Sequence, residues 1–269
     1  MRVDNCDLHT HTTYSDGRSP VDDNVRGAEA AGLDAIAIAD HLFPEGSAEF
    51  GDRGRLRERL AEVQRARAWA SVRVIMAVEA TALDLRGAIS VGPEDLAGVE
   101  LVLVDLSKLT AGVGFAVPDG RLRQLDALFG LYSRLAEIPW VDVLAHPFNL
   151  GRFGLDLTLS DLPEGALRDL GQHLKAHGVA CELISTFWWW WPQLHPDQVA
   201  EEYARVVRAL AAGGACFTLA SDAHANCSVG NLAWAQRVAR LAEFGPEQWA
   251  DLDALLARHT VGAASTAYG

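Results

Sequence analysis

The sequence predicts an α/β fold in which parallel strands, joined by helices, close into a barrel. Short apolar segments alternate along the chain with amphipathic ones, and nearly every apolar segment runs into a histidine or an acidic residue. Strands that are connected by helical crossovers run in the same direction. In a closed βα barrel the functional residues gather at the carboxyl ends of the strands, whereas in an open, doubly wound sheet ligands bind where the strand order reverses. We therefore expect the barrel, with the open sheet as the alternative.

Length and composition fit one domain. With 269 residues, 49% of them hydrophobic, the chain could form one large α/β domain or two small ones. No internal repeat, low-complexity tract or change of composition marks a linker. We expect residues 1–269 to form a single domain.

Seven segments are predicted to be strands. The first carries an alternation of Val3, Cys6 and Leu8 and leads into a pair of histidines. The second is an apolar run with the composition of a buried strand, and it leads directly into Asp40 and His41. The first expected strand starts near Val3 and ends at the two histidines, and the others span residues 33–39, 72–78, 101–104, 141–145, 179–181 and 216–220.

Helices are predicted between these strands. The first begins at Ser19-Pro20 and ends before Gly32, a common residue after the last helical turn. The second, residues 55–70, places Leu56, Leu60 and Val63 on one face and charged residues on the other. The remaining helices are expected at residues 121–137, 162–177, 199–210, 231–242 and 246–258.

The segment Asp7-Leu8-His9-Thr10-His11 predicts a metal site. In a strand, residues i and i+2 point to the same face, so His9 and His11 would direct both imidazoles to one point. Asp16, in the Ser-Asp-Gly turn that follows, could add a carboxylate. Mixed nitrogen and oxygen ligands suit zinc, manganese or iron.

Histidines and acids recur at the ends of the later strands. A single histidine after an apolar strand is more often structural than a ligand, but here the pattern repeats at the same end of successive strands. A ring of imidazoles and carboxylates at one mouth would repel itself unless cations held it together. The set consists of His9, His11, Asp16, Asp40, His41, Glu79, His146, Glu182, Asp222 and His224.

These motifs resemble those of the PHP family, named for polymerase and histidinol phosphatase. The resemblance includes the opening His-x-His with its Ser-Asp-Gly turn and runs, in family order, through Asp40-His41, Val78-Glu79, Ala145-His146-Pro147 and Ser221-Asp222-Ala223-His224. It implies a distorted seven-stranded, TIM-like βα barrel with two or three divalent metal ions (Mn, Zn or Fe). It also implies hydrolysis of phosphate esters by a metal-activated water.

The resemblance further implies a ligand set. One metal would be held by His9, His11, Glu79 and Asp222, a second by Glu79 and His146, and a third by Asp16, His41 and His224. Many family members have another histidine after the fourth strand, and residues 104–108 contain none. Asp105, His195 or water could replace it, or the site could hold fewer metals.

Catalytic and substrate-binding roles are assigned to residues near this centre. Asp222 or Glu182 could orient the attacking water, and His224 or His41 could assist proton transfer to the leaving alkoxide. Arg152, Arg18 and Lys108 are candidates for binding the substrate phosphate, with Arg152 the strongest because related family loops carry such an arginine. The tryptophan run, Trp188 in particular, could stack against a planar substrate or could simply plug the barrel mouth.

The overall charge restricts the partners. A net charge of -13 argues against a protein that binds long nucleic acids, although a cluster of cations could still attract a small phosphorylated substrate. Four cysteines without paired spacing, no targeting signal and no apolar run of membrane-spanning length fit a cytoplasmic protein that does not enter a membrane.

The sequence thus favours a phosphoesterase that acts on a small phosphomonoester or nucleotide-like phosphate. Three alternatives remain open: an exonuclease or nucleoside bisphosphate phosphatase acting on short nucleic acid, a metal-binding PHP scaffold without catalysis, and a hydrolase of amides or lactones. The oligomeric state is not predicted.

Overall fold

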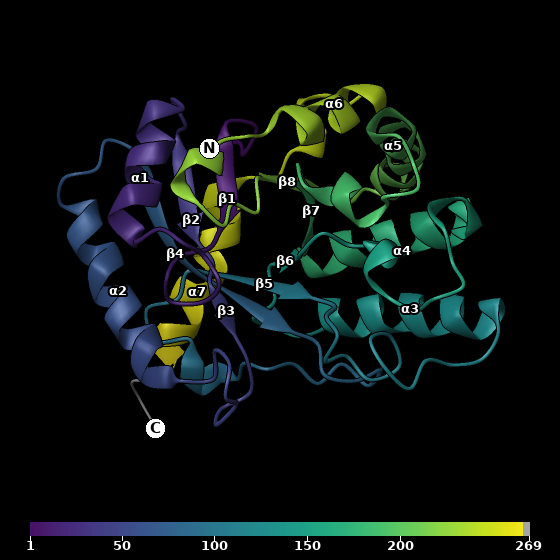
Figure 1. The fold of residues 1–269 in the computed structure, drawn as a ribbon, viewed down its shortest axis with the longest axis horizontal. Coiled ribbons are helices and arrows are strands. Elements are labelled where there is room, and N and C mark those ends of the chain that lie inside the picture. Colours follow the sequence, from purple (N-terminus) through teal and green to yellow (C-terminus); the bar gives the residue numbers. More distant parts are fainter. Residues whose placement is uncertain (266–269) are drawn as a thin grey trace.

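The computed structural model describes the backbone of residues 1–265 and the side chains of residues 1–258. Within this part of the chain, one parallel sheet is surrounded by helices (Figure 1). The sheet order is β1-β2-β4-β5-β6-β7-β8, and the short β3 pairs with β4 outside this path. The strands are β1 (Cys6–Thr10), β2 (Ala35–Ile38), β3 (His41–Leu42), β4 (Arg73–Thr81), β5 (Leu101–Asp105), β6 (Val143–Leu144), β7 (Ala180–Ile184) and β8 (Phe217–Ala220).

The sheet closes into a barrel where the chain leaves β8. The Asp222 backbone N–H donates to His9 O at 3.0 Å, and the His11 N–H donates to Ala223 O at 2.8 Å. Thr10 and Ala223 form a parallel bridge there. The predicted barrel of seven parallel strands is therefore confirmed, and it is distorted because the last contact forms beyond the end of β8.

Strand alternation divides the core into two layers. Ile36, Ile38 and Met76 face outward and pack under the helices. Ala35, Ala37 and Ile75 face inward and pack with Leu252 and Leu255 of α7. Because α7 packs against this inner layer, it fills the amino end of the barrel and leaves the carboxyl end for the polar residues.

The helices lie where the alternating pattern predicts them. Helices α1 to α6 flank the outside of the sheet, while α7 passes behind the strands (Figure 1). None of the described helices has both the length and the apolar character needed to cross a membrane. They are α1 (Val21–Ala30), α2 (Arg53–Arg67), α3 (Arg121–Ala136), α4 (Glu164–His177), α5 (Pro196–Ala212), α6 (Ala233–Leu241) and α7 (Leu252–Ser265).

Two sequence predictions are corrected by the structure. The last helix begins at Leu252 rather than at residue 246, because the Asp251 side chain accepts hydrogen bonds from the Asp253 and Ala254 N–H groups and so caps it there. Strands β4 and β7 also extend further than expected, so Glu79 and Glu182 lie within their strands instead of at the ends.

Candidate metal centre

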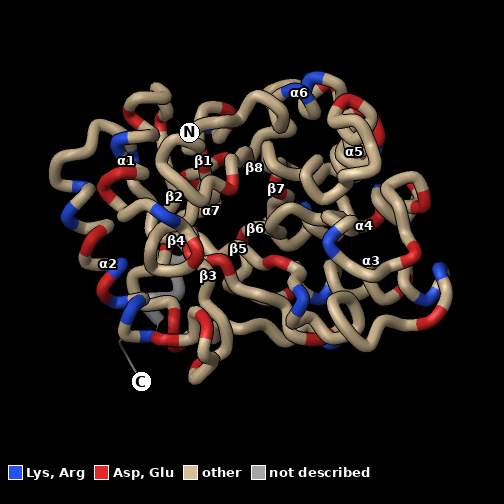
Figure 2. The backbone as a smooth tube through the Cα atoms, viewed as in Figure 1, with Lys and Arg blue, Asp and Glu red and all other residues tan. Residues whose placement is uncertain are grey.

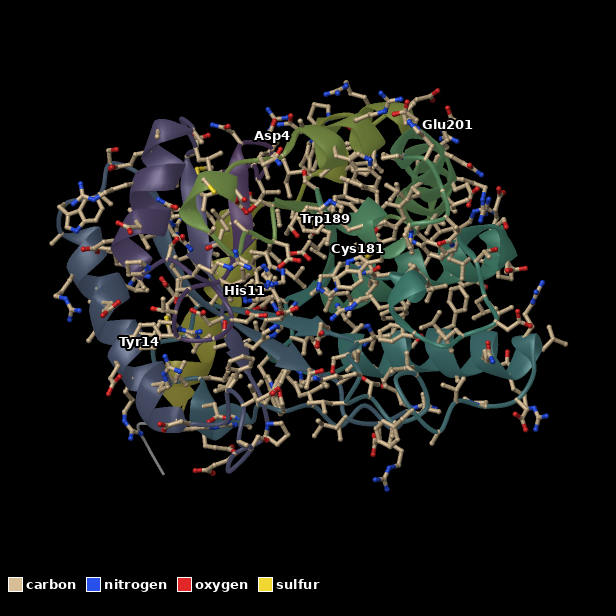
Figure 3. All side chains as sticks on the ribbon, viewed as in Figure 1. Asp4, His11, Tyr14, Cys181, Trp189 and Glu201 are labelled. Atoms are coloured by element: carbon tan, nitrogen blue, oxygen red, sulfur yellow. The ribbon has the colours of Figure 1, made fainter. Side chains whose placement is uncertain are left out.

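The polar residues at the carboxyl end of the barrel form one cluster. Figure 3 shows His11 near the middle of the molecule, among nitrogen and oxygen atoms contributed by several strands. Charged residues of both signs are spread over outer helices such as α2 and α3, and acidic residues also lie centrally, beside β3 and β5 (Figure 2). The eight predicted metal ligands fall into four overlapping groups, and within each group the ligand atoms lie within 4.8 Å of one another.

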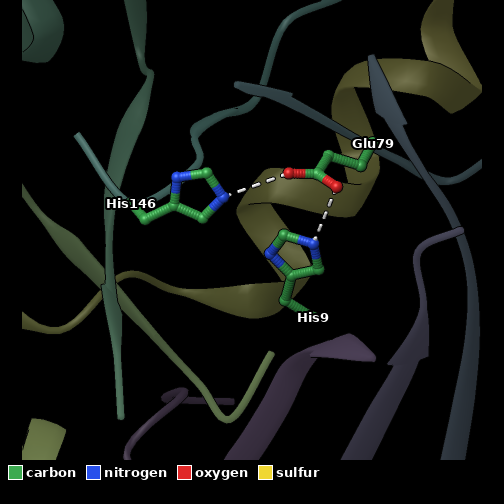
Figure 4. Close-up of side chains that lie close together, drawn as sticks. All are labelled: His9, Glu79 and His146. Atoms are coloured by element: carbon green, nitrogen blue, oxygen red, sulfur yellow. Dashed lines mark hydrogen bonds and ion pairs between the residues drawn. The ribbon is translucent and has the colours of Figure 1, made fainter. Parts of the chain in front are cut away.

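Glu79 stands at the middle of the cluster. Its Oε1 lies 3.2 Å from His146 Nε2 and its Oε2 lies 3.3 Å from His9 Nε2 (Figure 4). The Glu79 and His9 side chains are at most 1% exposed. This carboxylate has one oxygen toward each of two imidazoles, which is the geometry that a bridging ligand requires.

His11 and Asp222 continue the cluster toward solvent. His11 Nε2 lies 3.1 Å from Asp222 Oδ1, and it also lies 3.1 Å from His9 Nε2. Asp222 is only 14% exposed. Three donor atoms from the ends of β1 and β8 thus face one point, as three ligands of one cation would.

Asp16 completes the outer part of the cluster. Its Oδ2 lies 3.1 Å from His224 Nε2 and 3.6 Å from His41 Nε2, while its Oδ1 lies 3.4 Å from His11 Nδ1. Asp16 and His224 are 38% and 41% exposed. The turn that carries Asp16 therefore closes the rim of the centre.

The backbone is unusual where two ligands leave the sheet. His146 has φ 32° and Asp222 has φ 55°, both in the left-handed region. Such conformations cost on the order of 1–3 kcal/mol each and are typical of functional sites. They turn both side chains into the barrel mouth immediately after β6 and β8.

The imidazoles of the cluster lower the pKa values of three of its carboxylates. Burial alone would raise the pKa of Glu79, but His41 and His9 outweigh it and hold that pKa well below its usual value. Burial is likewise outweighed at Asp222, chiefly by His11, and at Asp16, chiefly by His224 and His41, so both pKa values are lowered. Anionic oxygens are therefore available as ligands.

The donor atoms fit divalent cations. Glu79 Oε2 and His41 Nδ1 lie 2.7 Å apart but make no hydrogen bond, and both atoms are buried. Both oxygens of Asp105 are also buried without a hydrogen bond among the described residues. Such atoms are costly to bury unless something else satisfies them. Cations between these mixed nitrogen and oxygen donors would do so, and the donor set suits zinc, manganese or iron.

Glu182 lies behind the centre. Its Oε1 accepts from His9 Nδ1 at 2.9 Å, its Oε2 accepts from the His146 N–H at 2.9 Å, and its side chain is fully buried. An acceptor on Nδ1 fixes the tautomer of an imidazole and leaves Nε2 free to ligate. With both oxygens engaged, Glu182 is placed to orient His9, and the role in orienting a water that the sequence suggests for it stays a prediction.

Two acidic residues of the opening segments hold loops instead of ligating. Asp40 was expected at the rim, but it lies in none of the four groups, and it accepts hydrogen bonds from Thr12 and Ser15. Asp7, which sequence reasoning passed over, accepts from the N–H groups of Ser221 and Gly230. Asp7 thereby fixes the segment that carries Asp222.

Two cavities adjoin the centre, on either side of Trp190. The first has a volume of about 380 Å³ and is lined by residues that include His41, Asp105, Lys108 and Arg152. The second has a volume of about 480 Å³ and is lined by residues that include Arg18, Trp189, Asp222 and His224. The structure thus places Arg152 and Lys108 on one side of the metal centre and Arg18 on the other.

The tryptophan run contributes different residues from the one predicted. Among the described residues that line the two cavities are Trp189 and Trp190, whereas Trp188 packs, half-buried, against the core. The run forms a 3-10 turn, Phe187–Trp190, in which successive side chains point in different directions. The Arg152 guanidinium carbon lies 4.6 Å from the Trp190 ring centre, and Arg152 Nη1 lies 3.9 Å from Asp105 Oδ2.

His195 and Asp105 are the two side chains that could replace the histidine absent from residues 104–108. The His195 side chain is 74% exposed and accepts from the Asp197 N–H at the start of α5, so it is not a ligand in this arrangement. Asp105 is 1% exposed and lines the first cavity beside His41. Of the two side chains considered, Asp105 alone faces the centre.

The structure is thus a βα barrel whose candidate metal site lies at the carboxyl ends of the strands, where barrel enzymes carry their active sites. Residues 7–115 match the family model of the PHP domain. Over these residues the chain is therefore similar to the PHP family. The matched segment contains His9, His11 and Glu79, and the fold brings His146 and Asp222 to them from outside it.

A solved structure shows the same fold. Histidinol phosphate phosphatase from Lactococcus lactis subsp. lactis Il1403, whose structure contains zinc, L-histidinol and phosphate, is 12% identical with a TM-score of 0.63, over 92% of this chain and 99% of that one. A chain of an archaeal ribonuclease P bound to mature tRNA is 12% identical with a TM-score of 0.45, over 88% of each chain. No curated protein sequence matches the chain.

Proposed function

We propose that this protein is a metal-dependent phosphoesterase that hydrolyses a small phosphate ester. The match of residues 7–115 to the PHP domain and the fold shared with a histidinol phosphate phosphatase support this class of activity. The observation that carries the proposal is the position of Glu79 between His9 and His146, next to a cavity lined by Arg152 and Lys108.

We assign two or three divalent cations to the cluster. Glu79 would bridge an inner pair, with His9, His11 and Asp222 on one side and with His146, joined by Asp105, on the other. Asp16, His41 and His224 would hold a third. Bound cations would supply Lewis acidity, neutralise charge on the phosphate and lower the pKa of water toward neutrality.

The number of cations decides what His41 and His224 do. Burial alone would lower the pKa of His224, but Asp16 and Asp222 raise it to about 9, so without a cation beside it this imidazole is protonated at neutral pH. With two inner cations, His224 or His41 is placed to donate a proton to the leaving alkoxide. With three, both imidazoles would be ligands, and solvent would have to supply the proton. Asp222 faces the second cavity and would help to orient the water.

The substrate phosphate is assigned to the first cavity. Arg152 is held between the Trp190 ring and Asp105, and a guanidinium fixed in this way can bind a phosphate with two parallel hydrogen bonds. Lys108 lines the same cavity and adds a second positive charge. Arg18 would contact the organic part of the substrate in the second cavity.

The residues that line the second cavity indicate which kind of organic group the substrate carries. Trp189 is 59% exposed and lines this cavity together with Asn231 and Ser228. An exposed indole beside polar side chains suits a planar, hydrogen-bonding group. Nucleotides are therefore included among the candidate substrates, as is a short oligonucleotide. The net charge of -13 argues against long polymers.

We further propose that residues 1–269 form one PHP-type domain. The last strand, β8, is followed by a backbone bridge to β1, so the two ends of the chain contribute to one sheet. A division of this sheet into two independent units would leave strand edges unpaired on both.

Phosphate release provides the test. The protein is treated with a chelator, reloaded with manganese, zinc or iron, and assayed against phosphomonoesters, nucleotides and short oligonucleotides. We expect release from at least one small ester, and none from a His9→Ala and Asp222→Ala double variant. Wild-type release no greater than that of the double variant, from a protein that has bound its metals, would support the non-catalytic scaffold instead.

A further inference from the structure

The Asp40 side chain is an acceptor for four donors of one short loop. Its Oδ1 accepts from the N–H groups of Thr12 and Ser15 at 2.7 Å and 3.1 Å, and from the Ser15 hydroxyl at 2.7 Å. Its Oδ2 accepts from the Thr12 hydroxyl at 2.8 Å. Asp40 is fully buried, so these contacts are shielded from water.

The charge of Asp40 is balanced from outside the barrel. Arg59, on α2, places Nη1 at 3.1 Å from Asp40 Oδ2, and its Nη2 donates to Ala77 O at 2.9 Å. Arg59 is 2% exposed. Ala77 lies on β4, two residues before Glu79. The guanidinium therefore links α2, the strand that carries the central carboxylate, and the acid that holds residues 12–15.

The loop that Asp40 holds carries an outer ligand. Residues 12–15 connect His11 with Asp16, and the two ends of the loop face the same cluster. Asn24 adds a further restraint, because its Nδ2 donates to His11 O at 2.8 Å. Asp16, in contrast, is 38% exposed. Its position depends on the loop before it and on the Arg18 N–H after it, which donates to His224 O at 2.8 Å.

We propose that Arg59 and Asp40 are positioning residues for the outer cation, the one assigned to Asp16, His41 and His224. This inference rests on the cation sites of the proposed function. A buried carboxylate that loses its guanidinium partner draws in water, and this water takes the place of some of the loop's donors. The loop would then release Asp16. The inner ligands His9 and Glu79 lie on strands and do not depend on the loop.

The first test compares two arginines. Arg59→Met should lower the number of manganese ions bound per chain by one, measured by elemental analysis and by calorimetric titration of chelator-treated protein. The control is Arg258→Met, because Arg258 forms a similar buried pair with Asp142 at the other end of the barrel. Arg59→Lys should restore part of the lost binding, since it keeps the positive charge. Arg59→Met protein that is folded and binds as many ions, as tightly, as Arg258→Met protein would overturn the inference.

A milder pair of variants covers the case in which Arg59→Met does not fold. Thr12→Val removes one hydroxyl donor to Asp40 and should weaken the weakest manganese site by about 10-fold. Thr158 is the matched control, because its N–H and hydroxyl also both donate to one carboxylate, that of Asp161, in an exposed turn away from the centre. Equal manganese titrations for Thr12→Val and Thr158→Val would overturn the inference.

These measurements separate the two proposals. Cations are counted without any substrate, so wild-type protein that binds three ions and releases no phosphate contradicts the proposed function alone. Wild-type protein that releases phosphate with only two ions bound, and whose Arg59→Met variant also binds two, contradicts the positioning role alone.

Discussion

The two ends of the barrel each bury a carboxylate against an arginine, but with different surroundings. At the amino end, Asp142 Oδ1 lies 3.1 Å from Arg258 Nε, and Asp142 Oδ2 accepts from the Val102 N–H at 2.8 Å. At the carboxyl end, Asp40 and Arg59 form a pair of the same length, 3.1 Å. Both pairs tie a helix to the sheet, and none of the four residues lines either of the two cavities beside the centre.

The difference lies in the acids beyond the pair. The carboxyl end also buries Glu79 and Asp105, and oxygens of both lack hydrogen bonds among the described residues. Arginine approaches only one of these acids, as Arg152 reaches Asp105 at 3.9 Å. At the amino end the buried Asp142 has Arg258 beside it, whereas at the carboxyl end Glu79 is surrounded by imidazoles and has no arginine within ion-pair distance among the described residues. Imidazolium groups or metal ions would have to balance its charge.

The largest effect is expected when the central carboxylate is neutralised. Glu79→Gln removes the negative charge between His9, His41 and His146, so at least the inner cations should be lost. Activity should fall by more than about 100-fold, the upper range for residues that only support a ligand. Metal analysis and phosphate release measure this, with circular dichroism as the check on folding. A folded variant that keeps its full metal content would contradict the proposal that the carboxyl end of the barrel needs metal ions to balance Glu79.

A smaller loss of metal affinity is expected from a substitution at Glu182, which contacts His9 and His146 from behind the centre. Glu182→Gln keeps the size of the side chain but offers only one oxygen, so either His9 or the His146 N–H loses its acceptor. Metal affinity should fall by about 10-fold to 100-fold. Calorimetric titration with manganese measures the change. If Glu182 orients water instead, kcat should fall while metal affinity stays at the wild-type value.

The fold was predictable because the alternation of apolar and amphipathic segments determines both strand direction and barrel closure. The two-residue strand β3 was not, since it exists only through the pairing of His41 with Glu79 of a distant strand. Most of the site followed from topology, as the carboxyl ends of parallel strands must meet. The metal-binding and catalytic roles of these residues stay predictions.

Where the predicted and observed sites differ, the side chains point in another direction than expected, although the residues lie where the sequence predicts them. Asp40 and His41 are neighbours in an extended segment, so their side chains must point to opposite sides, and only His41 faces the centre. That rule could have separated them from sequence alone. For the tryptophan run no such rule was available, because a 3-10 turn cannot be told from a loop by composition, and Trp190 was therefore missed in favour of Trp188.

Loss of the carboxylate should change the unfolding free energy in both ion pairs, whereas it should change manganese binding only in the Asp40 pair. Asp40→Asn leaves Arg59 buried without an anion and should cost about 3–5 kcal/mol of unfolding free energy. Asp142→Asn should cost about 1–3 kcal/mol, because Arg258 still donates to backbone carbonyls of His177, Gly178 and Val141. Urea unfolding of chelator-treated protein gives both values. An equal loss of manganese in the two variants would contradict the comparison, since Asp142 lies at the far end of the barrel.

The smallest effect is expected at the tryptophans between the two cavities. Trp190→Ala removes the ring on which Arg152 is stacked, an interaction of about 0.5–1 kcal/mol, so KM for a phosphate ester should rise by about 2-fold to 5-fold with little change in kcat. Trp189→Ala is the matched control, because Trp189 lines only the second cavity. It should change KM for esters with a planar organic group and leave simple alkyl phosphates unaffected. If KM for alkyl phosphates instead changes in Trp189→Ala and not in Trp190→Ala, the phosphate is bound in the second cavity, by Arg18, and not in the first, by Arg152.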